Sequence, residues 1–172
     1  AALVNVGIHL RFQGRPDESL ERHERSLALS REVGARMVEA SALANISVTL
    51  RDMGRLAESS ERAQQHAALA RELGDRWNEA HAYALIANVA HSLGRLEEAR
   101  EHHVRSLRIA EETGDREAVA LAHLNLALLL REQGELAASE ERLTTSLTVS
   151  ETGGDHRLRV QSRILRHLVR AE

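Results

Sequence analysis

Glycine recurs in this 172-residue sequence with a fixed period. Two sets of four glycines each keep a spacing of 40 residues, and they are Gly14, Gly54, Gly94, Gly134 and Gly34, Gly74, Gly114, Gly154. A constant period of this length is typical of repeat architectures. The 19 residues between successive glycines have helical apolar spacing, which predicts a helix of several turns. We therefore predict a chain of helix pairs joined by glycine turns.

The residues beside the glycines predict where helices end and begin. Glycine adopts the left-handed conformation that favours a helix C-terminus. Asp75, Asp115 and Asp155 each follow a glycine, and aspartate is a preferred N-cap. The only proline, Pro16, falls in a first helical turn, where its missing N–H costs little. The predicted repeats span roughly residues 1–34, 35–74, 75–114 and 115–154.

Alignment of the repeats shows columns of small residues where paired helices would cross. These columns are Gly7, Ser47, Ala87, Ala127; Ser19, Ser59, Ala99, Ser139; and Ser26, His66, Ser106, Ser146, with His66 as the exception. Small side chains allow close helix approach, so we assign the serines to packing. Large apolar columns, such as Val6, Ile46, Ile86 and Leu126, would form a core that each repeat completes only by stacking on its neighbour.

The composition excludes several kinds of site. All 23 basic residues are arginine, and cysteine is absent. The sequence therefore lacks a phosphate-loop lysine, a Schiff-base lysine, a disulfide and a cysteine nucleophile. The ten histidines form no His-Glu-x-x-His motif and no i, i+4 pair, so we expect no metal site and no cofactor. No apolar run approaches the roughly 20 residues that span a bilayer. We expect a non-enzymatic protein without membrane contact, in the cytoplasm.

Charge is distributed unevenly along the sequence. Residues 1–155 contain 18 Arg against 25 Asp and Glu, whereas residues 156–172 contain five Arg against one Glu. Binding to a phosphate backbone depends on clustered positive charge. Because acidic residues outnumber arginines in residues 1–155, we expect no direct contact between this domain and nucleic acid.

The turn sequences resemble those of tetratricopeptide repeats. Residues 94–99, Gly-Arg-Leu-Glu-Glu-Ala, are similar to the turn consensus of that family, and residues 73–76, Leu-Gly-Asp-Arg, are similar to its longer variants. The 40-residue period exceeds the usual 34 and resembles the long repeats of Leu-Gly-Asn adaptors, kinesin light chains and bacterial regulators. The resemblance implies an all-α, right-handed superhelical solenoid of antiparallel helix pairs. It also implies a concave groove, lined by the first helix of each pair, that binds a protein or peptide segment.

Residues 156–170 predict a final amphipathic helix that departs from the repeat. A solenoid needs a terminal helix with one polar face to cover its open end. We interpret this helix as a cap, with a basic contact surface for an acidic partner as the alternative. At the other end, the sequence starts inside a predicted inner helix, so an open apolar end could support self-association.

The resemblance to tetratricopeptide repeats places particular columns in the groove. The candidate partner-binding residues are Asn5, Asn45, Asn88, Asn125, Ser41, His81, His91, Arg11, Arg51, Arg131, Val4, Ile8, Val48, Leu124 and Leu128. Asparagine both donates and accepts, so an asparagine ladder could hold a peptide backbone, or each amide could serve packing alone. The arginines could pair with ligand carboxylates, or complement the dipole at their helix ends. Trp77 is interpreted as a packing residue, with recognition as the alternative.

Two function hypotheses follow. The first is a scaffold whose groove binds a protein or peptide segment, using a preorganised surface to reduce the cost of binding. The second is a sensor or autoinhibitory domain of a larger bacterial regulator, binding a small effector or another domain of the same chain.

Overall fold

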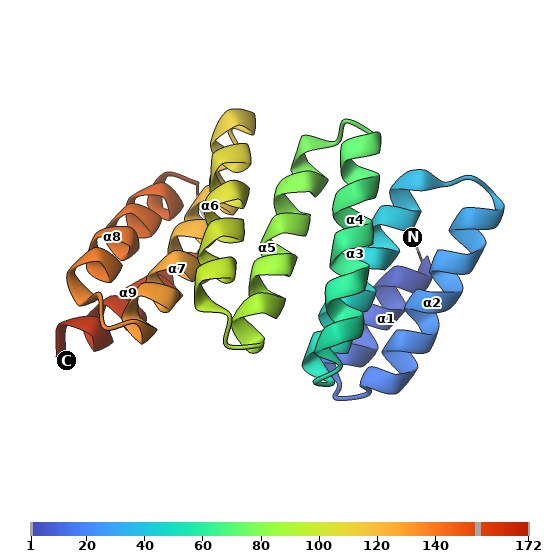
Figure 1. The fold of residues 1–172 in the computed structure, drawn as a ribbon, viewed down its shortest axis with the longest axis horizontal. Helices are drawn as coiled ribbons and strands as arrows, with labels where there is room; N and C mark the ends of the chain where they lie inside the picture. The colour runs from blue at the N-terminus through green and yellow to red at the C-terminus, as the bar shows by residue number, and fades with distance from the viewer. Residues whose placement is uncertain (1, 154–155, 172) are drawn as a thin grey trace.

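The computed structural model describes residues 2–153 and 156–171, which form nine α-helices and no strand (Figure 1). The helices are α1 (Ala2–Phe12), α2 (Pro16–Glu32), α3 (Arg36–Asp52), α4 (Leu56–Glu72), α5 (Arg76–Ser92), α6 (Leu96–Thr113), α7 (Arg116–Glu132), α8 (Leu136–Gly153) and α9 (His156–Ala171). Each helix packs against the next, and the odd-numbered helices also contact one another from α1 to α9. The molecule is an arched row of helix pairs with the termini at opposite ends (Figure 1).

The glycine turns have the predicted left-handed backbone. The ladder glycines from Gly14 to Gly134 have φ between 65° and 78°. At Gly94 the turn closes with a 2.9 Å hydrogen bond from the Arg95 amide to the Ala90 carbonyl, which satisfies a carbonyl of the last helical turn. The predicted turn at Gly154 and Asp155 lies outside the described residues.

Two kinds of helix start occur along the chain, with and without a side-chain N-cap. Asp75 and Asp115 are N-caps, as predicted, and their carboxylates accept from the amides of Asn78 and Ala118 at 3.0 and 3.1 Å. The helices that follow the other glycine ladder begin after residues such as Arg55, whose side chain makes no cap. That guanidinium instead pairs through two nitrogens with Glu58, at 2.7 and 2.6 Å.

The small columns lie where the helices of a pair cross. Ser47 and Ser59 are buried and exchange hydrogen bonds, each donating to the other's backbone carbonyl at 3.0 and 2.7 Å. Gly7 is the most restricted position, because a Cβ there would lie 2.4 Å from an atom of the buried His23 ring. The structure confirms that these columns permit close helix approach.

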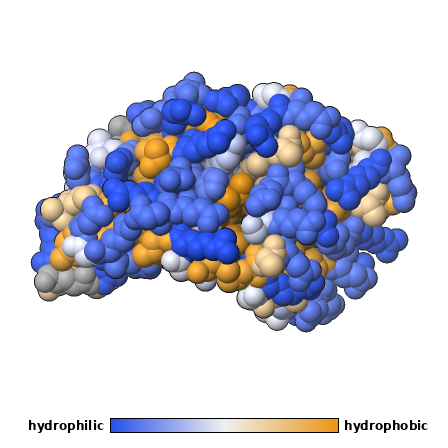
Figure 2. Space-filling model, viewed as in Figure 1, coloured by the Kyte–Doolittle hydropathy of each residue, from blue (hydrophilic) through white to orange (hydrophobic). Residues whose placement is uncertain are grey.

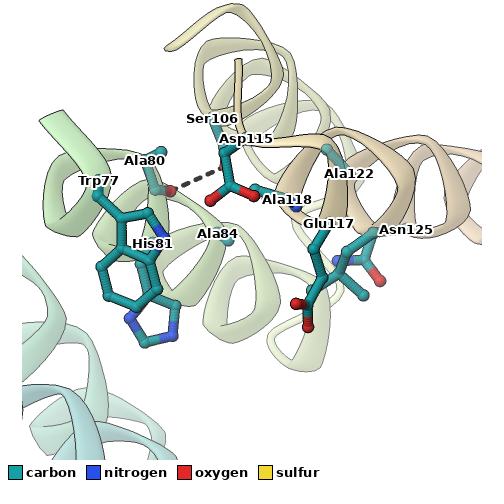
Figure 3. A pocket seen from close by; sticks show the side chains of 11 residues that line it. Trp77, Ala80, His81, Ala84, Ser106, Asp115, Glu117, Ala118, Ala122 and Asn125 are labelled. Carbon is teal, nitrogen blue, oxygen red and sulfur yellow. Dashed lines mark hydrogen bonds between the residues drawn. The ribbon is translucent and has the colours of Figure 1, made fainter. Parts of the chain in front are cut away.

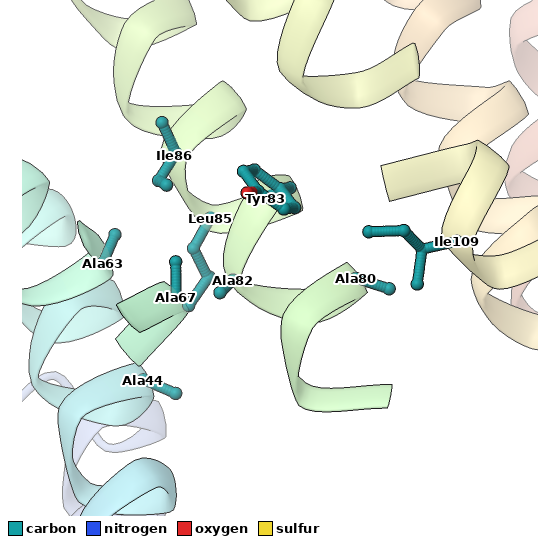
Figure 4. Packing of buried hydrophobic residues seen from close by; sticks show 9 residues of the cluster. All are labelled: Ala44, Ala63, Ala67, Ala80, Ala82, Tyr83, Leu85, Ile86 and Ile109. Carbon is teal, nitrogen blue, oxygen red and sulfur yellow. The ribbon is translucent and has the colours of Figure 1, made fainter. Parts of the chain in front are cut away.

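Between the crossings lie clusters of larger apolar side chains. In the central cluster, Tyr83 and Ile86 of α5 pack with Ile109 of α6 and with alanines of α3 and α4 (Figure 4). This cluster therefore joins neighbouring repeats, as expected for a solenoid.

The final helix, α9, packs on α8 and α7 through the buried side chains of Leu158, Leu165 and Val169. Its outward surface is not uniformly polar as predicted, because Ile164 and Leu168 are exposed. These two residues lie one helical turn apart, so they form an apolar stripe on α9.

The opposite end of the solenoid exposes residues whose counterparts in the next two repeats are buried. Val6 is 49% exposed, whereas its counterpart Ile46 is 0% exposed. Leu29 is likewise exposed, whereas Leu69 and Ile109 are buried. The apolar end predicted from the sequence is thus present, and self-association through it stays a prediction.

Candidate functional site

A pocket of about 270 Å³ opens between α5 and α7, toward the N-terminal ends of both helices. Trp77 and His81 of α5 line one side, and Asp115 and Glu117 at the start of α7 line the other (Figure 3). The remaining lining residues are Ala80, Ala84, Ser106, Ala118, Leu121, Ala122 and Asn125. Most of the exposed lining surface is apolar, and its polar groups are concentrated on the α7 side.

A second pocket, of about 520 Å³, lies between α7 and α9. Leu124, Leu128, Ile164, Leu165 and Leu168 make its apolar surface, while Arg157 and Gln161 add polar groups. Leu121 and Asn125 of α7 line both pockets, so they form a ridge between the two, and we refer to the two pockets with this ridge as the groove. On the face drawn in Figure 2, apolar side chains gather in several patches within a largely hydrophilic surface.

A buried hydrogen-bond network supports the α5 wall of the first pocket. The side-chain nitrogen of Asn78, Nδ2, donates to the Asp75 carboxylate at 2.7 Å. The side-chain oxygen of Asn78, Oδ1, accepts from His66 Nε2 at 3.2 Å. Burial lowers the pKa of His66, opposed by its hydrogen bond to Asn78. The His66 ring also contacts His81 edge-on, with centroids 5.7 Å apart, and His81 lies the same distance from Trp77. The indole, 57% exposed, is therefore positioned by a ring stack that begins in the core.

The predicted arginine and histidine column takes part in ion pairs between inner helices. Arg11 donates to Asp52 at 2.8 Å, and Arg51 contacts the same carboxylate at 3.2 Å. His91 contacts Glu132 at 2.8 Å. The Arg11–Asp52 contact joins α1 to α3 and the His91–Glu132 contact joins α5 to α7, which is a structural role for these residues beside the predicted ligand role.

The predicted asparagines have different surroundings. Asn125 lines both pockets. Asn45 is half-buried and donates to the Ser41 carbonyl of its own helix at 2.8 Å, whereas Asn5 is exposed and Asn88 is half-buried. The structure therefore brings one of the four asparagines into the groove between α5 and α9.

The remaining predicted residues also divide between groove and core. His81 lines the first pocket, and Leu124 and Leu128 line the second. Val4 is buried, as is most of Leu124, while Ile8 and Val48 are half-buried. Ser41 is exposed and donates to the Met37 carbonyl, and Arg131 has an interaction partner.

Several groove residues were missed by the sequence analysis, although the period could have found them. Leu121 lies 40 residues after His81, in the column that also contains Ser41. Ile164 and Leu168 of α9 lie 40 residues after Leu124 and Leu128, so they belong to the same two columns of the repeat. The final helix was treated as a cap, so the columns were not extended into it.

Comparison with known proteins identifies the architecture. A tetratricopeptide repeat family model matches residues 1–72 and 78–163. The chain belongs to the tetratricopeptide repeat family. This match confirms the resemblance and, with the nine described helices, the all-α solenoid fold.

Solved structures of tetratricopeptide-like proteins have the same fold. The apo form of RapI matches with a TM-score of 0.83 at 17% identity, covering 98% of this chain and 62% of RapI. A Rap protein complexed with competence and sporulation factor matches with a TM-score of 0.90 at 17% identity, covering 97% of this chain and 46% of that one. A putative kinesin light chain repeat protein from Podosopora anserina matches with a TM-score of 0.76 at 15% identity, covering 98% and 83%. At these identities the likeness shows the fold alone.

Comparison with curated protein sequences found no match. In the described part of the chain, no group of three or more His, Asp or Glu side chains could hold a metal ion. None of the described helices is long and apolar enough to cross a membrane.

Proposed function

We propose that this tetratricopeptide repeat domain is a non-enzymatic scaffold that binds an extended protein or peptide segment in the groove formed by α5, α7 and α9. The supporting observation is that the two pockets lie side by side across α7, with Leu121 and Asn125 lining both. A segment lying across α7 would reach both pockets at once, whereas a small ligand would occupy only one.

The exposed apolar side chains of the groove also support this proposal. Trp77, Leu121, Ile164 and Leu168 come from three successive inner helices, yet all four are exposed. Large apolar side chains gathered on one surface are characteristic of interaction sites. None of the four belongs to the buried apolar clusters of the same repeats.

Trp77 provides the test, because it is the sole tryptophan and lines the groove. We expect members of a diverse library of extended peptides to shift its emission in a saturable manner. Leu121→Asp places a charge on the ridge between the pockets and should abolish that binding. Val104→Asp is the matched control, since Val104 is exposed on the outer helix α6 and lines neither pocket.

Both variants should retain the far-ultraviolet circular dichroism and the thermal midpoint of the wild type within a few degrees. Saturable peptide binding that Leu121→Asp leaves intact would show that the groove is not the binding site. The absence of any binding from the library would contradict the proposed function.

A further inference from the structure

The two pockets differ in chemistry, which bears on the kind of segment the groove accepts. The α5–α7 pocket places the rings of Trp77 and His81 opposite the carboxylates of Asp115 and Glu117, above a floor of alanines (Figure 3). The α7–α9 pocket is lined mainly by leucine and isoleucine. Only the first pocket therefore combines aromatic rings with negative charge.

The negative charge of the first pocket is not neutralised by its own lining. No arginine is among the residues that line it. Asp115 uses one carboxylate oxygen to accept the Ala118 amide at 3.1 Å, and its other oxygen lies on the pocket side in Figure 3. Glu117 is exposed and also lines this pocket. Asp115 and Glu117 therefore give the pocket two carboxylates.

An arginine or lysine side chain suits this arrangement. Its aliphatic stem can lie on Ala84 and Ala118, while its charged end reaches the carboxylates. A guanidinium can also stack on the indole of Trp77, because the face of an aromatic ring attracts cations. An acidic side chain would instead be repelled by Asp115 and Glu117.

The distance between the pockets sets the spacing of the ligand. They lie on either side of one inner helix, and packed helices have axes about 8–10 Å apart. An extended segment of the polyproline II type rises about 9 Å in three residues and returns to the same face. The side chains of residues i and i+3 can therefore enter the two pockets, with the intervening backbone over Asn125, whose amide can donate and accept.

On this basis we propose that the groove selects a segment with arginine or lysine at position i and a large apolar residue at position i+3. The basic side chain occupies the pocket between Trp77 and Asp115, and the apolar side chain packs on Ile164 and Leu168. This assignment rests on the proposed peptide-binding function and adds the chemical class of the ligand to it.

The test uses acetylated and amidated octapeptides carrying a fluorophore, with the residues at i and i+3 varied and serine or alanine elsewhere. Binding to the full chain is followed by fluorescence anisotropy. We expect peptides with Arg or Lys at i and Leu, Ile or Phe at i+3 to bind most tightly. Replacing the basic residue with Ala should weaken binding about tenfold, and replacing it with Glu should abolish binding.

Variants of the chain separate the two pockets. Asp115→Asn keeps an N-cap acceptor for α7, so combining it with Glu117→Gln removes the charge without removing the cap. This double variant should lose the preference for Arg and Lys but keep the preference at i+3. Ile164→Ala should do the reverse. Raising the salt concentration should weaken the wild type more than the double variant.

The outcomes distinguish this inference from the proposed function. If peptides bind and Leu121→Asp abolishes binding, but Arg, Ala and Glu at position i bind equally, the assignment of the basic pocket is wrong and the peptide-binding function stands. An unchanged basic preference in the Asp115→Asn, Glu117→Gln double variant would also overturn the assignment. If no peptide binds, both proposals fail.

Discussion

Acid should destabilise this fold through histidines that it buries in the neutral form. His103 of α6 is 1% exposed, and its Nδ1 has no hydrogen-bond partner. Burial, with smaller contributions from His91 and His102, lowers its pKa from 6.5 to about 4. The unfolded chain binds this proton more tightly than the folded chain, so acid favours unfolding. The contribution of neutral His103 to the free energy of unfolding is fully present above about pH 6.5 and is lost as the pH decreases toward 4.

The size of the effect follows from the two pKa values of His103. With a pKa of about 6.5 in the unfolded chain and about 4 in the folded one, protonation costs about 2 kcal/mol at pH 5 and about 3 kcal/mol at pH 4. The pKa of His23 in α2 is also lowered to about 4, by burial first and by Arg11 second, so it adds a loss of similar size.

The repeats themselves suggest a substitution that removes this loss. Leu143 occupies the position of His103 one repeat later and is fully buried. The facing residue is alanine in both repeats, Ala87 in one and Ala127 in the other. Leucine should therefore fit in place of His103. Between pH 7.5 and pH 5, the free energy of unfolding should fall by about 2 kcal/mol less in His103→Leu than in the wild type.

Urea unfolding followed by circular dichroism at several pH values measures this difference. His167→Gln is the matched control, because it also removes one histidine but from an exposed position on α9. Carboxylates titrate alike in all three proteins, so they cancel in the comparison. An equal loss of stability in His103→Leu and the wild type between pH 7.5 and pH 5 would show that burial of His103 does not cause the acid sensitivity.

Three further substitutions test the packing and the turns. Gly7→Ala should destabilise the fold by about 1–3 kcal/mol because the new Cβ overlaps the His23 ring, and His23→Ala should reverse that loss in a double-mutant cycle of urea midpoints. Gly94→Ala should cost about 1–2 kcal/mol in the same assay, since its φ of 73° strains a side chain, and an unchanged midpoint would contradict the turn geometry. Leu158→Ala should cost about 2–5 kcal/mol and speed amide exchange in α9, because this buried side chain anchors the helix, whereas unchanged exchange would show that α9 is held elsewhere.

The helices, turns and small columns could be predicted because each depends on short-range rules. A glycine such as Gly94 ends a helix through the conformation of one residue, and Asp75 caps a helix through a contact three residues away. The period repeated these signals along the chain. The alignment also predicted that Ser47 and Ser59 lie where helices cross, since a small residue recurs at both positions, whereas their mutual hydrogen bonds became visible only in the structure.

The candidate groove was predicted less completely, because its openings depend on how successive repeats pack. Val4 and Leu128 both belong to the predicted inner face, yet Val4 is buried, whereas Leu128 lines a pocket. Arg11 was a candidate for ligand binding, but the fold pairs it with Asp52, 41 residues away. Such contacts depend on the separation and tilt of neighbouring inner helices, which local sequence rules do not contain.

The sequence by itself determined the repeat, the helix boundaries and the family, because glycine geometry, capping and helical periodicity act over a few residues. The tertiary structure decided which inner-face positions open into pockets and which are closed by packing. It placed Trp77 opposite Asp115, an N-cap whose sequence context indicated only a helix start. The physical reason is that a groove is a space between elements, and its shape depends on the packing of side chains from several helices at once.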